Sequence, residues 1–394
     1  MKKLMMTLCA VGLMFAGCNK QSGEDNPLLQ KWDTPFETAP FEKIKVEHYL
    51  PAFEAAIAEH DKEIQAIIDN AEAPTFDNTI AALDYSGETL SKVAGVFFNM
   101  MAANTSEELQ KVNEKVGPMM ATHSDNVSMN AKLFEKIKPV YDAKDSQKYT
   151  GEQLALLEKT YNKFVRSGAL LDAAKQEELR KVNAELTKVE SKFDANLLKE
   201  SKAYQLVIDK EENLKGLPQG EIEKAAALAK SEGKEGKWIF TLDNPSFMPF
   251  VTYADNRDLR KEIFNARVNR CNNGGETDNN ALVAQMSELR AKKAQLLGYE
   301  TFAHYQLEER MAKEPKAVFD LLENLLSYSV KVAKEEAAQF QTLLSKDVPG
   351  ATLEAWDMYY YAEKVRQQKY SFDAELTRPY FEINKVRQGC FDVL

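Results

Sequence analysis

The sequence predicts a mainly α-helical protein, built from long antiparallel helices with a small β ribbon. Apolar side chains recur every three or four positions over most of the chain beyond residue 40, which is the period of one helix face. Only two short segments show the alternation and β-branching of strands. At 394 residues, 44% apolar and 28% charged, the chain can bury one large core or two ordinary ones.

The N-terminus predicts export. Lys2 and Lys3 precede an apolar run from Leu4 to Ala16, which is too short to span a bilayer as a mature helix and is typical of a signal peptide. The run ends in Phe15-Ala16-Gly17-Cys18, which resembles a bacterial lipobox. We therefore expect a signal peptide over 1–17, a lipid on Cys18, and membrane anchoring that faces the periplasm or the cell exterior. Plain secretion is the alternative.

A polar stretch follows the predicted anchor. It has too little apolar surface to fold alone, and we expect a flexible tether over 18–30. The helical body then covers 31–394.

The clearest helix of this body places Leu179, Val182, Leu186, Val189 and Phe193 on one face, with Asp172 at the position of an N-cap. Similar patterns predict further helices, at 47–70, 77–101, 106–129, 151–166, 221–230, 256–270, 278–297, 315–345 and 353–370.

The β ribbon is predicted from 204–209 and 238–243, which alternate and end near turn residues. At the end of the chain, residues 386–394 have the pattern of an amphipathic helix that has just begun.

Composition excludes several functions. The net charge is −10, which does not favour nucleic acid. The sequence contains no Gly-x-Ser-x-Gly and no Walker-type glycine loop. Two cysteines, Cys271 and Cys390, remain after the predicted signal and lipid, and we expect two separate buried thiols rather than a disulfide.

Metal ligands are sparse. The four histidines are so scattered that the closest two, His48 and His60, lie twelve positions apart, whereas a zinc helix needs two at i and i+4. The pairs His60 with Glu63 and His304 with Glu308 could each face one ion, but neighbours of this kind are common by chance. We predict no metal ligand in this chain.

One constellation could bind substrate. Arg260, Arg267 and Arg270 recur near one face of the predicted helix 256–270, and guanidinium groups bind carboxylates in a bidentate manner. The alternative is a solvated face with ion pairs to Asp258 and Glu262. Tyr359–Tyr361 could donate to an oxyanion, although aromatic residues in a helix mostly pack in the core.

Several stretches carry a family resemblance. They are Pro40–Phe53, Pro74–Thr79, Trp238–Ser246, Arg290–Tyr299, Glu309–Ala312, the run from Trp356 to Arg366, and Arg378–Glu382. In this order they resemble the M3 family of zinc metallopeptidases, most closely the bacterial peptidyl-dipeptidases, which release dipeptides from the C-terminus of oligopeptides.

The resemblance implies a helical body in two lobes around a channel, with one Zn²⁺ held by two His and a Glu. In the family an HExxH helix follows shortly after, but no HExxH occurs here before Leu394. We therefore expect an N-terminal portion without its C-terminal lobe, inactive alone, with apolar patches exposed. The alternative is a lipid-anchored helical lipoprotein that binds peptides or proteins without catalysis.

Overall fold

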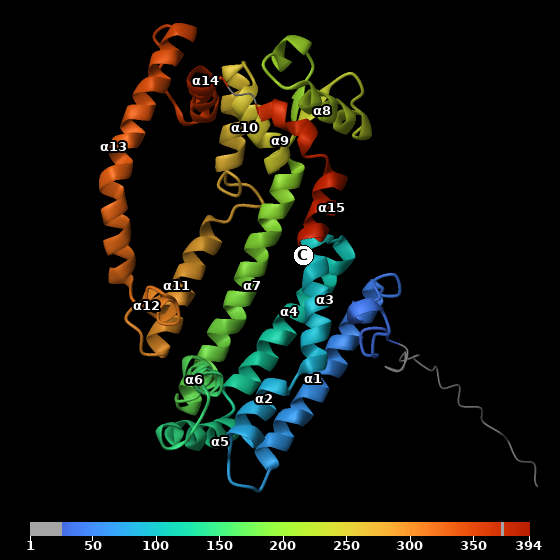
Figure 1. Cartoon of the computed structure of the whole chain (residues 1–394), viewed down its shortest axis with the longest axis vertical. Coiled ribbons are helices and arrows are strands. Elements are labelled where there is room, and N and C mark those ends of the chain that lie inside the picture. The colour runs from blue at the N-terminus through green and yellow to red at the C-terminus, as the bar shows by residue number, and fades with distance from the viewer. Residues whose placement is uncertain (1–25, 372–373) are drawn as a thin grey trace, which may run out of the picture. The chain divides into compact units, whose positions relative to one another are not determined.

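The computed structural model describes residues 26–371 and 374–394. It is mainly helical with a two-stranded ribbon, so the predicted fold class is confirmed (Figure 1). The predicted signal peptide and Cys18 lie outside the described residues. The chain divides into two compact units, with the division between Thr187 and Lys188.

Unit 1 consists of helices joined by short turns. Its elements are α1 (Val46–Asp69), η3 (Phe76–Ala81), α2 (Ala82–Tyr85), α3 (Glu88–Ala103), α4 (Glu107–Ser128), α5 (Ala131–Asp142) and α6 (Gly151–Arg166), with short 3₁₀ turns at Pro35–Glu37 and Lys144–Ser146. The helix α7 (Ala173–Ala203) crosses the division between the units.

Side-chain caps start several helices of unit 1. Ser106 accepts a hydrogen bond from the Leu109 amide (3.2 Å), and Asn130 accepts one from the Leu133 amide (3.1 Å). The predicted cap of α7 is confirmed, because Asp172 Oδ1 accepts from the Lys175 amide at 2.9 Å. Such caps satisfy amides that have no partner within the helix.

Two apolar clusters hold unit 1 together. One joins α1, α3 and α4, where Phe53 and Phe97 meet edge to face with centroids 5.4 Å apart. The other joins α1, α5 and α6 around Ile137 and Phe164. The amphipathic periods of the sequence therefore mark real buried faces.

The predicted tether is too long at its C-terminal end. Leu28 is completely buried in the first cluster, and the Asn26 side chain donates to the His48 carbonyl at 2.8 Å. Residues 26–30 therefore belong to the folded body, because a single buried leucine can dock an otherwise polar segment.

Unit 2 contains the ribbon and the remaining helices. The strands β1 (Leu206–Ile208) and β2 (Trp238–Phe240) pair antiparallel, with Leu206 opposite Phe240. The helices are α8 (Gln219–Ser231), α9 (Asn244–Tyr253), α10 (Arg257–Val268), α11 (Asn280–Leu296), α12 (Phe302–Leu307), α13 (Pro315–Asp347), α14 (Met358–Tyr370) and α15 (Ile383–Val393), with 3₁₀ turns at Glu211–Leu214, Ala355–Asp357 and Ala374–Tyr380. The ribbon packs with α8, α9 and α10 in one apolar cluster.

Sequence periodicity missed three helices and one break. The helices α5, α9 and α12 were not predicted, and the single helix expected over 77–101 is interrupted at Ser86 and Gly87. Gly87 has φ +74°, a left-handed conformation that favours glycine and stops a helix. Within the described residues, no helix is both long and apolar enough to cross a bilayer.

Candidate functional site

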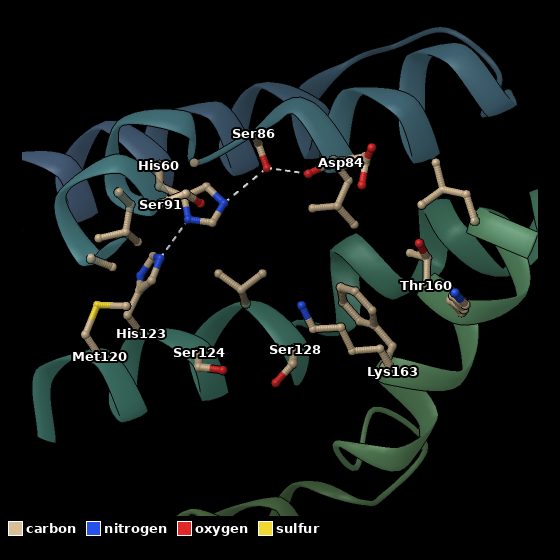
Figure 2. Close-up of a pocket in the computed structure, with 18 residues that line it drawn as sticks. His60, Asp84, Ser86, Ser91, Met120, His123, Ser124, Ser128, Thr160 and Lys163 are labelled. Carbon is tan, nitrogen blue, oxygen red and sulfur yellow. Dashed lines mark hydrogen bonds between the residues drawn. The ribbon is translucent and has the colours of Figure 1, made fainter. Parts of the chain in front are cut away.

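A polar pocket opens inside unit 1. Its volume is about 500 Å³, and it lies among α1, α2, α3, α4 and α6 (Figure 2). Apolar groups such as Leu90, Met120 and Phe164 form part of the lining, and hydroxyl, imidazole and ammonium groups form the rest. This combination of apolar walls with a few polar groups is typical of small-molecule sites.

A chain of polar contacts runs along one side of the pocket. His60 Nε2 lies 3.1 Å from Ser86 Oγ, and His60 Nδ1 lies 2.9 Å from His123 Nε2. His123 Nδ1 lies 3.2 Å from Asp61 Oδ1, an ionic contact without hydrogen-bond alignment. The two rings come from α1 and α4 and meet edge to face.

Gly87 makes room for this chain. A Cβ at this position would lie 3.0 Å from His60 Nδ1, and its φ of +74° is one that other residues rarely adopt. The Gly87 amide donates to Glu63 Oε2 at 2.7 Å. The helix break that the sequence did not reveal is therefore the feature that seats the His60 ring.

The surroundings of His60 disfavour its charge. Burial, followed by the neighbouring His123, lowers the pKa of His60, while Glu63 and Asp61 oppose this effect and Lys163 adds to it. His60 is therefore held neutral to a lower pH than a free histidine.

Two proton arrangements satisfy the chain. With both rings neutral, Ser86 donates to His60, His60 donates to His123, and the remaining N–H of His123 faces Asp61. In the other, Ser86 donates to the Leu83 carbonyl (2.7 Å) and His60 donates to Ser86. Then His123 Nε2 donates to His60 Nδ1. The direction of the hydrogen bonds along the chain can therefore reverse.

His60 and Glu63, the His–Glu pair considered in the sequence, have different hydrogen-bond partners. Glu63 lies one turn along α1 but bonds Gly87, while the ring of His60 meets His123, sixty-three positions away. The other proposed pair also separates, since His304 contacts Thr301 at 2.8 Å and Glu308 accepts from Tyr299. Among residues 26–371 and 374–394, no group of three His, Cys, Asp or Glu could hold a metal ion.

A second polar cluster lies in unit 2. The Arg257 guanidinium binds the Asp357 carboxylate in a bidentate manner, with Nε–Oδ1 3.0 Å and Nη2–Oδ2 2.8 Å. Arg260 adds a third contact through Nη2 at 3.1 Å and donates to the Ala254 carbonyl at 2.8 Å. Asp357 is 0% exposed and Arg260 1%, so the predicted solvated face with Asp258 and Glu262 is wrong for Arg260.

The other two arginines of the predicted substrate site also have partners. Arg267 donates to the Leu242 carbonyl and to Asn244, and its guanidinium lies 4.4 Å from the Phe247 ring centroid. Arg270 donates to Ser201 Oγ at 3.0 Å. Each arginine therefore has a structural partner, and the carboxylate-binding role of Arg260, Arg267 and Arg270 stays a prediction.

The tyrosines and cysteines have structural settings. Tyr360 and Tyr361 are buried, as expected of core residues, and Tyr360 donates to Asp255 at 2.8 Å. Cys271 and Cys390 are both free, as predicted, but only Cys271 is buried. The prediction of a buried thiol is therefore wrong for Cys390.

The first two thirds of α13 expose an apolar face. Only Phe340 and Leu344, near its end, are buried. The exposed apolar side chains are Phe319, Leu321, Leu322, Leu325, Leu326, Tyr328, Val330 and Val332. A patch of this kind on a long helix is typical of a surface that contacts further polypeptide.

The described residues form a mainly helical protein with an open pocket in unit 1 and a closed ion-pair cluster in unit 2. Residues 250–394 match the profile of peptidase family M3. The chain is 34% identical, over 92% of its length, to a dipeptidyl carboxypeptidase of Salmonella typhimurium, and 33% identical over 93% to one of Escherichia coli. It is also 29% identical, over 94% of its length, to an oligopeptidase A of Salmonella typhimurium.

These matches confirm the resemblance to the M3 peptidases. They cover 53%, 54% and 54% of the three relatives, respectively. The chain therefore spans about half the length of the curated relatives it matches.

Proposed function

We propose that this chain is part of a zinc-dependent M3-type peptidase that releases dipeptides from the C-terminus of oligopeptides. The observation that carries the proposal is the identity with two dipeptidyl carboxypeptidases over more than nine tenths of the chain. The similarity to oligopeptidase A is lower, which favours dipeptide release over internal cleavage.

The residues present do not fit a zinc centre. The sequence has four histidines and no HExxH, and the described residues bring no three metal-binding side chains together. We therefore assign no catalytic residue within 1–394 and propose that the metal ligands of the peptidase lie outside this range. The exposed face of α13 fits a protein in which further polypeptide covers it.

Expression of two products tests this proposal. The DNA beyond the codon for Leu394 is sequenced. Residues 1–394 and the longer product that this DNA encodes are then compared for hydrolysis of a fluorogenic oligopeptide. We expect chelator-sensitive dipeptide release from a longer product that contains HExxH and none from 1–394. Chelator-sensitive hydrolysis together with stoichiometric zinc in 1–394 would overturn the placement of the metal site.

The arginine prediction has its own test in the longer product. Arg267→Ala is expected to weaken cleavage of peptides with a free C-terminus more than cleavage of C-amidated peptides, because only the former present a carboxylate. An equal loss on both substrates would reject a role in binding the peptide terminus.

We also propose lipid anchoring through Cys18, on the basis of the sequence Phe15-Ala16-Gly17-Cys18. Lipid anchoring is compatible with the peptidase and with a lipoprotein that only binds peptides. Mass spectrometry of the membrane fraction is expected to find lipid on Cys18, and Cys18→Ser is expected to release the protein. An unmodified, unanchored wild-type protein would favour plain secretion.

A further inference from the structure

We propose that the pocket of unit 1 binds a small amphipathic carboxylate, a molecule with one free carboxylate on a short apolar body. The proposal rests on the geometry of this pocket and not on the peptidase assignment. It assigns a ligand class to His60, Ser86, His123 and Lys163.

The pocket has the size and the division of surface for such a ligand. Its volume of about 500 Å³ lies in the range of small-ligand sites. Leu83, Leu90, Met120, Leu156 and Phe164 offer apolar contact to the body of the ligand. Figure 2 shows the two imidazole rings at one side of the pocket, with Thr160 and Lys163 of α6 at the other.

The charges at the pocket favour an anion. Lys159 and Lys163 line it, against one lining carboxylate, Asp84. Among the described residues, the ammonium group of Lys163 makes no hydrogen bond or ion pair, although its charge acts on His60. An anion between Lys163 and His60 would therefore gain a charge-assisted contact without breaking an existing pair.

The serine is better placed to bind than to attack. A serine nucleophile needs amide donors for the oxyanion that forms, and the adjacent amide of Gly87 already donates to the carboxylate of Glu63. Ser86 can instead donate its hydroxyl proton to a bound carboxylate.

Proton uptake by His60 is coupled to binding. A bound carboxylate beside His60 would stabilise the imidazolium form, so its pKa would rise from its lowered value. The affinity is therefore expected to increase as the pH falls through the titration range of His60. The charged or titratable groups around His60 are Asp61 and Glu63 of α1, Asp84 of α2, His123 of α4, and Lys159 and Lys163 of α6.

Titration calorimetry on the whole chain tests the proposal with three probes, N-acetyl-alanyl-phenylalanine, its C-terminal amide, and hexanoate. We expect one saturable site for a free acid and binding of the amide at least about tenfold weaker, because the charged contact is lost. In parallel, NMR titration is expected to show that the pKa of His60 rises on binding.

Two lysine variants give the matched comparison. Lys163 is exposed in α6. Lys163→Gln is therefore expected to fold normally and to weaken binding of the free acid at least about tenfold. Lys148→Gln removes an equally exposed charge of unit 1 away from the pocket and is expected to leave binding unchanged.

The outcomes separate the sources of the carboxylate. Preference for the dipeptide acid over hexanoate identifies a peptide terminus, and the reverse preference identifies short-chain acids; both support the site. The proposal is overturned if neither acid binds at millimolar concentration, if acid and amide bind equally, or if Lys163→Gln leaves the affinity of the acid unchanged.

Discussion

The polar clusters described in the two units differ in whether their charged groups are enclosed by other residues. In unit 2, Asp357 receives both Arg257 and Arg260, and the carboxylate has no exposed surface. In unit 1, the chain from Asp61 through both histidines to Ser86 ends at a pocket of about 500 Å³. A closed cluster stabilises a fold, while an open one leaves polar groups that can meet a ligand.

The largest expected effect is on the closed cluster. Asp357→Ala leaves two arginines without their carboxylate, one of them 1% exposed, and is expected to reduce the free energy of unfolding by about 3–5 kcal/mol. Urea denaturation measures this change. As a control, Asp320→Ala removes an exposed carboxylate paired with Lys316 and is expected to change stability little. Equal effects of the two would show that the cluster is not structural.

Acid is expected to weaken the closed cluster. Burial raises the pKa of Asp357, but hydrogen bonds from Arg257, the Glu354 amide and Arg260 outweigh it, so the pKa lies below its ordinary value. A lowered carboxylate pKa adds stability that is present above pH about 4 and lost as the pH falls through the folded pKa. Urea midpoints between pH 7 and 3 are expected to show this loss in the wild type, with a smaller loss in Asp357→Asn.

Removal of a tyrosine hydroxyl beside the closed cluster is expected to have an intermediate effect on the free energy of unfolding. Tyr360→Phe removes a 2.8 Å hydrogen bond to Asp255 and is expected to cost about 1.5 kcal/mol. Tyr361→Phe, whose hydroxyl lies 3.3 Å from Asp347, is expected to cost less. Burial raises the pKa of Tyr361 to about 12, so spectrophotometric titration should find it un-ionised at pH 10. A larger loss from Tyr361→Phe than from Tyr360→Phe would contradict this order.

Gly87→Ala tests the open cluster. The left-handed backbone is expected to cost about 1–2 kcal/mol in a non-glycine residue, and the new Cβ would push against the His60 ring. The affinity for the carboxylate probes is expected to fall together with the stability. Thermal melting and the calorimetry described above measure the two effects. Binding that stays at the wild-type level would show that the position of His60 is unimportant for the ligand.

Gly95→Ala is the matched control and has the smallest expected effect. Gly95 lies in the interior of α3, and a Cβ there meets no atom within 4 Å. Alanine in an open helical position is expected to stabilise the protein by about 0.5–1 kcal/mol. If Gly95→Ala is destabilised, α3 tolerates no added methyl group. A loss of stability in Gly87→Ala would then not be specific to the position beside His60.

Long elements were predictable because their signal is local. The helix over residues 173–203 was found from its apolar face and the cap at Asp172, and the ribbon from its β-branched alternation. The short helices α9 and α12 were missed, since ten and six residues hold too few turns for a period to emerge. The break at Gly87 was missed because its reason is the ring of His60, which lies on another helix.

The sequence alone determined the mainly helical class, the ribbon, the scattered histidines and the resemblance to M3 peptidases, because periodicity, composition and motif order are properties of neighbouring residues. Only the tertiary structure decided that Arg260 pairs with Asp357 and that His60 meets His123 beside a pocket. Those partners are 97 and 63 positions apart. Contacts at that range depend on which helix faces pack together, and no local pattern records which faces do so.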